Sequence, residues 1–154
     1  MKAMNKEVTI HIRDEQATRA LGEKLGGLLH GGEVIELVGD VGAGKTTFTK
    51  GLALGLSIDE DVQSPSFTIS RVYDARDGLL MAHYDFYRLN DAGIMASELS
   101  EATQDPGTVT VIEWADIVEG VLPAERLRIA FTAPSENERS LTIDGPAEWI
   151  EGIL

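Results

Sequence analysis

Hydrophobic and polar residues alternate near the start of the chain. Three hydrophobic residues are each separated by one polar residue: Val8, Ile10 and Ile12. Since successive side chains of a strand point to opposite faces, this pattern predicts a half-buried strand over Glu7 to Arg13. Beyond Asp14 the spacing becomes helical, and four residues fall on one face: Ala17, Leu21, Leu25 and Leu28. We expect Asp14 to cap this helix and Gly31-Gly32 to end it.

Short hydrophobic runs and helical spacings alternate along the rest of the chain. Val34 to Val38 predicts a buried strand, and Lys45 to Leu56 predicts a helix. Phe67 to Tyr73 and Leu79 to Tyr84 flank the turn signal Ala75 to Gly78, which predicts an antiparallel hairpin. Further elements are predicted in the second half: a helix over Asp91 to Glu101, strands over Thr108 to Ile112, Arg126 to Phe131 and Ser140 to Ile143, and a short closing helix over Ala147 to Ile150.

Helices that alternate with strands are typical of an α/β domain with helices on both faces of a sheet. The predicted hairpin makes that sheet mixed, so we expect a three-layer, P-loop NTPase-like fold with a partly antiparallel central sheet. A length of 154 residues suits one substantial hydrophobic core but not two of comparable size. We therefore expect a single domain over residues 1–154.

A complete phosphate-binding loop connects the predicted strand at Val34 to the helix that begins near Lys45. It reads Gly39-Asp40-Val41-Gly42-Ala43-Gly44-Lys45-Thr46. Glycines let the backbone turn its N–H groups toward a polyphosphate, the lysine supplies a positive charge, and the threonine hydroxyl is suited to Mg²⁺. The helix that opens here adds its dipole to the attraction. The pattern predicts a nucleoside triphosphate site with bound magnesium.

Two acidic residues end predicted strands and are candidates for the rest of this site. Hydrolysis needs an acid to hold the metal and a group to orient the attacking water. We expect Glu113 to be the acid on the metal side, and Asp85 either to complete the metal shell or to position water. His83 lies on the same side of its strand as Asp85, and either a phosphate contact, a proton relay or a structural hydrogen bond fits it. For Trp114, core packing is favoured over a contact near the nucleotide.

Charge and composition limit the classes of partner. The formal net charge is −13 and the pI is near 4.5, which argues against unassisted binding to DNA or RNA because the electrostatic contribution would be repulsive. Cysteine is absent, which fits a reducing compartment. No apolar run reaches membrane-spanning length, and Met1 to Arg13 does not resemble a signal peptide. We expect a cytoplasmic protein that binds neither membrane nor DNA.

Several motifs in order along the chain resemble the TsaE family, also called YjeE, the small ATPase of bacterial tRNA N6-threonylcarbamoyladenosine biosynthesis. The resemblance covers most of Asp14 to Leu127. The motifs that carry it are Asp14-Glu15-Gln16-Ala17-Thr18, the phosphate loop extended by Thr47-Phe48, Ser64-Pro65-Ser66-Phe67-Thr68, His83-x-Asp85-x-Tyr87-Arg88-Leu89 and Ile112-Glu113-Trp114. The phosphate loop alone is generic, and the motifs that accompany it make the resemblance specific.

The resemblance implies a set of residue roles. ATP is expected to bind to the loop from Val41 to Thr46, that is Val41, Gly42, Ala43, Gly44, Lys45 and Thr46, extended by Thr47. Thr46 and Glu113 are expected on Mg²⁺, with Asp85 as a second essential acid that also belongs to the metal set. Lys45, Asp85 and Glu113 are the expected catalytic residues. Glu15 is expected near the base or ribose, and Arg139 near the nucleotide.

The resemblance also implies partners. These are the TsaB- and TsaD-type proteins that transfer threonylcarbamoyl to adenosine 37 of tRNAs reading codons that begin with A. The ATPase is then expected to drive or reset the transferase complex and to meet tRNA only indirectly. An acidic chain is compatible with docking on proteins.

Three other functions are considered. A small P-loop kinase needs a basic lid over its substrates, but no Arg or Lys occurs between Leu89 and Thr108. A GTPase is disfavoured because no Asn-Lys-x-Asp segment is present. A slow nucleotide-dependent assembly switch in another pathway overlaps with the favoured function and also predicts weak hydrolysis without partners.

Overall fold

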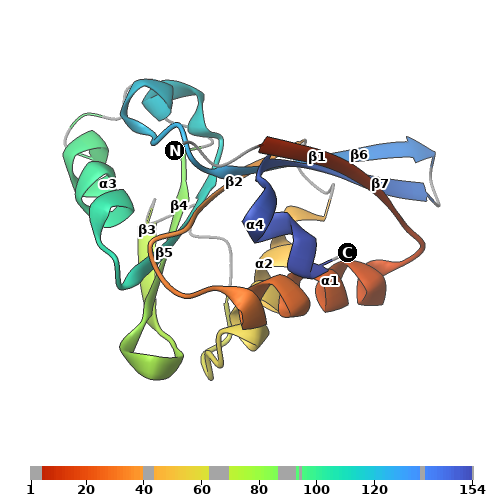
Figure 1. Ribbon diagram of the computed structural model, residues 1–154, viewed down its shortest axis with the longest axis horizontal. Helices are drawn as coiled ribbons and strands as arrows, with labels where there is room; N and C mark the ends of the chain where they lie inside the picture. The colour runs from red at the N-terminus through yellow and green to blue at the C-terminus, as the bar shows by residue number, and fades with distance from the viewer. Residues whose placement is uncertain are drawn as a thin grey trace.

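The computed structural model describes residues 5–39, 44–62, 70–86, 93, 95–135 and 138–153, and these form one mixed sheet with helices on both faces (Figure 1). The strands are β1 (Asn5–Ile12), β2 (Val34–Val38), β3 (Ser70–Asp74), β4 (Leu80–Asp85), β5 (Thr108–Glu113), β6 (Leu127–Ser135) and β7 (Glu138–Pro146). The α-helices are α1 (Glu15–Leu28), α2 (Lys45–Gly55), α3 (Met95–Gln104) and α4 (Ala147–Ile150). Three 3₁₀-helices are η1 (Arg76–Gly78), η2 (Ala115–Val121) and η3 (Glu151–Ile153).

The sheet has seven strands in the order β1-β7-β6-β2-β5-β4-β3. The central strand β2 pairs in parallel with β5 and β6, and β4 also pairs in parallel with β5. The outer pairs β1–β7, β6–β7 and β3–β4 are antiparallel. The predicted mixed α/β sheet is therefore confirmed, including the antiparallel β3–β4 pair. Because β2, β4 and β5 run in the same direction, their carboxyl ends meet at one edge of the sheet.

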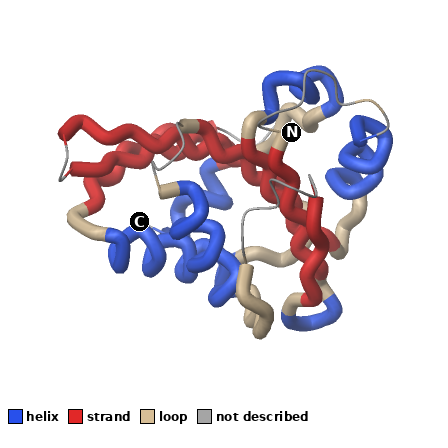
Figure 2. The backbone as a smooth tube through the Cα atoms, turned by 180° about the vertical axis from the view of Figure 1, so that it is seen from behind, coloured by secondary structure: helices blue, strands red, loops and turns tan. Residues whose placement is uncertain are grey.

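The helices form one layer on each face of the sheet. The helices α1, α2 and α4 cover one face, and α3 and η2 cover the other; the reverse view in Figure 2 shows the same two groups on opposite sides. Alternation along β4 explains the division: Met81 packs into the core under α1 and α2, whereas Ala82 and Tyr84 pack toward α3. This is the three-layer arrangement predicted from the sequence.

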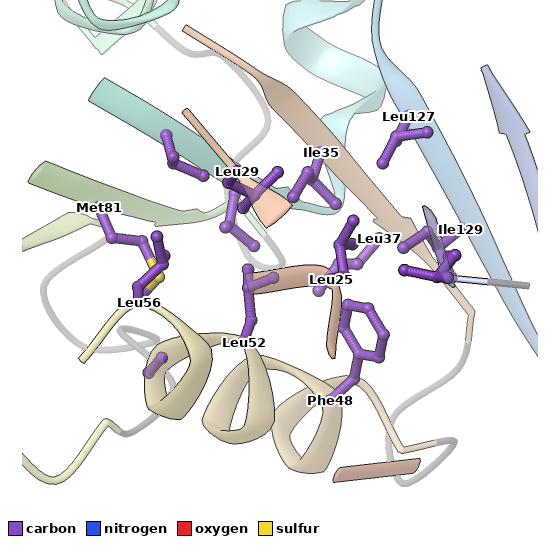
Figure 3. Packing of buried hydrophobic residues seen from close by; sticks show 14 of the residues in the cluster. Leu25, Leu29, Ile35, Leu37, Phe48, Leu52, Leu56, Met81, Leu127 and Ile129 are labelled. Carbon is purple, nitrogen blue, oxygen red and sulfur yellow. The ribbon is translucent and has the colours of Figure 1, made fainter. Parts of the chain in front are cut away.

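The larger core lies between α2 and the sheet. Phe48 and Leu52 of α2 and the following Leu56 are spaced four residues apart, so all three point toward the sheet. Ile35 and Leu37 of β2 belong to the same cluster, and Leu56 lies beside Met81 of β4 (Figure 3). All of these side chains are buried, and burying each large apolar side chain stabilises the fold by about 1.5–3 kcal/mol. This packing fixes the start of α2 against the carboxyl end of β2.

The helices α1 and α2 approach each other closely through glycines. Four positions would place an added Cβ against the backbone of the opposite helix: Gly22, Gly26, Gly51 and Gly55. The buried face of α1 therefore runs through Thr18, Gly22, Leu25 and Gly26. The prediction that Leu28 lies on the inward face is wrong, since its side chain is 41% exposed and lies beside Gly152. A hydrophobicity pattern does not register glycine as a buried position, and so the predicted face included Leu28 and left out the two glycines.

We expect Gly26→Ala to destabilise the protein, by about 3 kcal/mol, because the new methyl group would overlap the Leu52 carbonyl and push the helices apart. Gly27→Ala, one residue further along the same helix, meets no atom within 4 Å among the described residues. We expect that control to keep stability or raise it by up to about 1 kcal/mol, because alanine favours the helix. Urea unfolding followed by circular dichroism compares the two. Equal stability of the two variants would contradict the close packing of α1 and α2.

The turn between β3 and β4 joins the ends of both helices. The Arg76 guanidinium donates hydrogen bonds to four backbone carbonyls, those of Gly26, Gly27, Leu29 and Gly55. These carbonyls lie at or near the carboxyl-terminal ends of α1 and α2, where backbone acceptors lack partners within the helix and a positive charge is favourable. The residue predicted only as part of a turn thus ties the hairpin to the helix pair.

Other element boundaries differ modestly from the predictions. The helix predicted over Asp91 to Glu101 is observed as Met95–Gln104, with residues 91, 92 and 94 outside the described part of the chain. The strand predicted from Phe67 is described only from Ser70. The 3₁₀-helix η2 was not predicted. Within the described residues, no helix combines the length and the apolarity that spanning a bilayer requires.

Candidate functional site

The candidate site lies where three parallel strands end and α2 begins. In the sheet register Glu113 of β5 lies opposite Asp85 of β4 on one side and Leu37 of β2 on the other. His83 and Asp85 are two residues apart, so both project to the same face as Glu113. That face is the one covered by α2. The topology therefore brings His83, Asp85 and Glu113 together beside the end of the phosphate-binding loop.

Lys45, the first residue of α2, reaches back across this edge. Its side chain is only 5% exposed, and Nζ donates a hydrogen bond of 2.6 Å to the carbonyl oxygen of Gly39. The same Nζ lies 4.0 Å from Oε1 of Glu113 and 4.2 Å from the centroid of the Trp114 ring. Burial of an ammonium group is costly unless it is paired, and here a carbonyl, a carboxylate and an aromatic face surround it. The positive charge of Lys45 therefore lies next to Gly39, the first residue of the phosphate-binding loop.

Glu113 is the acid nearest this lysine. Its side chain is 3% exposed, and Oε2 lies 2.7 Å from Nε2 of His83, which is 1% exposed. One carboxylate oxygen therefore contacts the imidazole, and the other is the oxygen nearer to Lys45. The backbone N–H of Phe86 donates to the Glu113 carbonyl, which joins the end of β4 to the end of β5. The carboxylate therefore lies between the His83 imidazole and the Lys45 ammonium.

Asp85 ends β4 and is 6% exposed. Its position opposite Glu113 brings two buried acids to adjacent strand ends. Tyr84, between His83 and Asp85, faces away from them toward α3. Burial, together with the charges of Glu98 and Glu101, raises the pKa of the Tyr84 phenol to about 12, which keeps that group neutral.

The start of α2 is shaped for an anion. Gly44 precedes the helix with φ of 108°, a left-handed conformation that favours glycine. Gly44 has no side chain that could cap the first turn, and N–H groups at the start of a helix suit an anion. Thr46 is exposed and Thr47 is half-buried in this turn. Val41, Gly42 and Ala43, predicted to contact the phosphates, lie outside the described residues.

The two outlying predicted residues lie at the neighbouring end of α1. Glu15 is exposed in the first turn of α1, next to the cap Asp14, whose carboxylate accepts from the N–H of Ala17 at 2.8 Å. A Cβ added to Gly44 would lie 3.9 Å from Cγ2 of Thr18, one turn further along α1. This places the start of α1 beside the start of α2.

Arg139 of β7 lies opposite Ile12, just before α1, and donates to the carbonyls of Ser135 and Glu138. These contacts place it at the turn between β6 and β7. A role for Arg139 or Glu15 at the nucleotide stays a prediction.

Two further predicted segments lie outside the described residues. These are Ser64 to Thr68 and Tyr87 to Leu89.

The donor set fits a magnesium ion shared with a nucleotide. The described residues contain no group of three or more His, Cys, Asp or Glu side chains arranged to hold a metal by themselves. Magnesium is commonly held by one or two protein oxygens together with substrate phosphates and water. Glu113 and the hydroxyl of Thr46 offer oxygens of this kind, and Asp85 lies opposite Glu113 on the neighbouring strand.

For two residues of the site, the structure identifies a partner that the sequence left open. Core packing was favoured for Trp114, and its half-buried ring does pack against the core cluster on the α3 side, but the ring also lies against the Lys45 ammonium. Three alternatives were open for His83, and its contact with Glu113 is a hydrogen bond of the structural kind. The same-side spacing of His83 and Asp85 was a usable signal, but only the pairing of β4 with β5 identifies the partner.

Comparison with known proteins connects this geometry to one family. A family model described as threonylcarbamoyl adenosine biosynthesis protein TsaE matches residues 12–141. Among curated proteins, the tRNA threonylcarbamoyladenosine biosynthesis protein TsaE of Bacillus subtilis is 41% identical over 128 residues, covering 82% of this chain and 78% of its own. The protein of the same name from Treponema pallidum is 39% identical over 135 residues, covering 85% and 96%.

A solved structure shows the same arrangement. The crystal structure of YdiB from Bacillus subtilis aligns with a TM-score of 0.78 and 35% identity, covering 99% of this chain and 94% of that one. The likeness therefore extends from the motifs to the whole fold.

Proposed function

Because the chain belongs to the TsaE family of threonylcarbamoyl adenosine biosynthesis proteins, we propose that it is an ATPase that binds and hydrolyses ATP with Mg²⁺ to drive or reset a partner transferase complex. Through its family the chain takes part in tRNA threonylcarbamoyladenosine biosynthesis. The modified position is then adenosine 37 of tRNAs reading codons that begin with A.

One observation carries the ATPase proposal. The buried ammonium of Lys45 lies at the start of α2, between the Gly39 carbonyl and the Glu113 carboxylate. A lysine that only stabilised the fold would not need a positive-φ glycine and an uncapped helix start beside it. Together these features supply a positive charge and backbone donors at one point, which suits the β- and γ-phosphates of a nucleotide.

The residues of the site divide the chemistry between them. Lys45 and the first N–H groups of α2 would bind the phosphates and stabilise the charge that develops during phosphoryl transfer. Thr46 and Glu113 would hold Mg²⁺, which when bound neutralises charge on the phosphate oxygens. Asp85, at the neighbouring strand end, would either complete the metal shell or orient the attacking water.

The proposed partners are TsaB- and TsaD-type proteins of the transferase complex. The net charge of −13 would repel the phosphate backbone of tRNA, so contact with tRNA is expected to be indirect. A role in tRNA modification fits a cytoplasmic location. In this proposal docking also completes the site, so that hydrolysis by the free chain is slow.

The proposal is tested by measuring phosphate release from ATP by the chain alone, with the partner proteins, and with the partners and tRNA. We expect slow release alone and a rise of roughly tenfold or more with the partners, a common size for coupling between binding sites. The Lys45→Ala variant is the control. If the partners raise phosphate release equally in this variant, the ATP is hydrolysed by a partner and not by this chain.

The same assay separates the alternatives. Label from γ-labelled ATP that appears on a metabolite would indicate a small P-loop kinase. Hydrolysis that the partners leave unchanged would contradict the assembly role.

A further inference from the structure

His83 has a contact that no assigned role explains. It lies in the middle of the buried strand β4, two residues before Asp85, and its side chain is 1% exposed. Its Nε2 lies 2.7 Å from Oε2 of Glu113. Of the residues that the structure describes, none offers a hydrogen-bond partner to the other ring nitrogen, Nδ1. The imidazole therefore has a single polar contact in the described part of the chain, and that contact is the central acid of the site.

The geometry assigns the donor in this pair. Because an ionised carboxylate only accepts hydrogen bonds, we assign the proton of the 2.7 Å contact to Nε2. Nδ1 then has no described group to which a proton would pass. A proton relay through His83, one of the alternatives considered from the sequence, has no continuation among the described residues. The remaining action of the ring is to hold Glu113.

The orientation of Glu113 matters because its carboxylate is buried and its two oxygens have different neighbours. Oε2 is fixed by the imidazole, and this leaves Oε1 as the oxygen that faces Lys45 at 4.0 Å. Without a donor at Oε2, the carboxylate would be free to rotate or to pair more closely with the lysine ammonium. Either movement would take both groups away from a nucleotide.

We propose that His83 is a positioning residue for the ATPase reaction, which donates from Nε2 to Glu113 and keeps Oε1 directed toward the phosphates and their metal. The inference rests on the proposed ATPase function of this site. Partners of a ligating group typically change activity by about 10- to 100-fold when removed, although they touch neither substrate nor metal.

Two amide substitutions test the role of the donor. In His83→Gln the amide nitrogen is as many bonds from Cβ as Nε2 of histidine, so it can reach Oε2 of Glu113. In His83→Asn the amide is one bond shorter and falls short. With partners present, we expect the Asn variant to lower kcat for ATP at least about tenfold with little change in KM, and the Gln variant to recover most of the rate.

A purely structural role predicts a different result. Both amides would then lower thermal stability and kcat together, with no advantage of Gln over Asn. Wild-type kcat in the Asn variant, or equal loss in both variants, would overturn the inference. If the wild-type chain with its partners hydrolyses no ATP, the proposed function itself fails, which is a separate outcome.

A second measurement needs no activity. The chain has three histidines, and His11 and His30 are exposed, so they serve as internal controls. In nitrogen-15 NMR spectra of the wild-type protein, we expect the signals of the His83 ring to show that the proton is on Nε2. We also expect this proton to exchange slowly with water. Glu113→Gln should shift the His83 signals and leave those of the other two histidines in place. A His83 proton on Nδ1, or signals unmoved in Glu113→Gln, would overturn the pairing even if the His83 variants fail to fold.

Discussion

Replacing Glu113 with Gln is expected to lower ATP hydrolysis, measured with the partner proteins, by at least about 100-fold while the fold stays intact. The amide keeps the volume of the side chain, and its oxygen can still accept the hydrogen bond from Nε2 of His83. What disappears is the negative charge that faces Lys45 and the proposed magnesium. Because a neutral amide is a weaker ligand for Mg²⁺, the metal would be held less firmly when charge develops on the phosphates.

The measurement is phosphate release together with calorimetric binding of ADP and thermal unfolding. Glu125→Gln, at an exposed turn, is the matched control and should behave like the wild-type protein. Nucleotide binding should persist in Glu113→Gln because Lys45 and the start of α2 remain. Turnover retained in Glu113→Gln would assign the metal-side role to Asp85, which Asp85→Asn would then test.

Replacing Lys45 with Ala is the second large change, and it is expected to remove most nucleotide binding. Nζ is buried against the Gly39 carbonyl and is the positive charge closest to Glu113 in the described residues. A hydrogen bond to a charged group contributes about 1.5–3 kcal/mol, so affinity for ATP and ADP should fall by roughly tenfold to 100-fold or more. Loss of the ammonium also leaves the negative charge of Glu113 without a nearby cation, so the Glu113 carboxylate would repel the phosphates.

Isothermal titration calorimetry with ATP and with ADP measures this effect. Lys50→Ala is the control. Lys50 belongs to the same helix, but it lines a small surface pocket with Ala53 and Leu54 instead of lying at the start of the helix. Its affinity should match that of the wild-type protein. Equal affinities in Lys45→Ala and Lys50→Ala would contradict the phosphate site.

The position of the site follows from the direction of its strands. In an open sheet, parallel strands carry ligands at their carboxyl ends, where the loops leave the sheet and helix N-termini return to it. Here β2 leads into the phosphate loop, and β4 and β5 end in Asp85 and Glu113. The antiparallel strand β3 extends this arrangement at one edge without interrupting it.

Much of the fold and part of the site could be predicted from local sequence. The succession from strand to phosphate loop to helix is readable because each step depends on neighbouring residues: an apolar run, glycines, and then Lys45 followed by helical spacing. The mixed sheet followed from the turn signal before Leu79, and β3 and β4 are antiparallel as expected. The acids Glu113 and Asp85 were selected because both end an apolar run, and the structure places them at adjacent strand ends.

Other features depend on residues far apart in the chain. The face predicted for α1 is confirmed at Leu25 but not at Leu28, because glycines allow α2 to pack so closely that Gly22 and Gly26 belong to the buried face. The contact of His83 with Glu113 spans 30 residues and exists because β4 and β5 are neighbours in this register. Trp114 reaches Lys45 because its backbone turns into a left-handed conformation at φ of 57° after β5.

By itself, the sequence determined that a phosphate-binding motif stands between β2 and α2, and which types of side chain belong to it. The motif consists of consecutive residues from Gly39 to Thr46, so it can be recognised without knowledge of the fold. Only the tertiary structure decided which acid meets the lysine, which histidine holds that acid, and how closely the two helices pack behind them. These choices are set by strand order and by backbone-to-backbone packing, and both are properties of the whole folded chain.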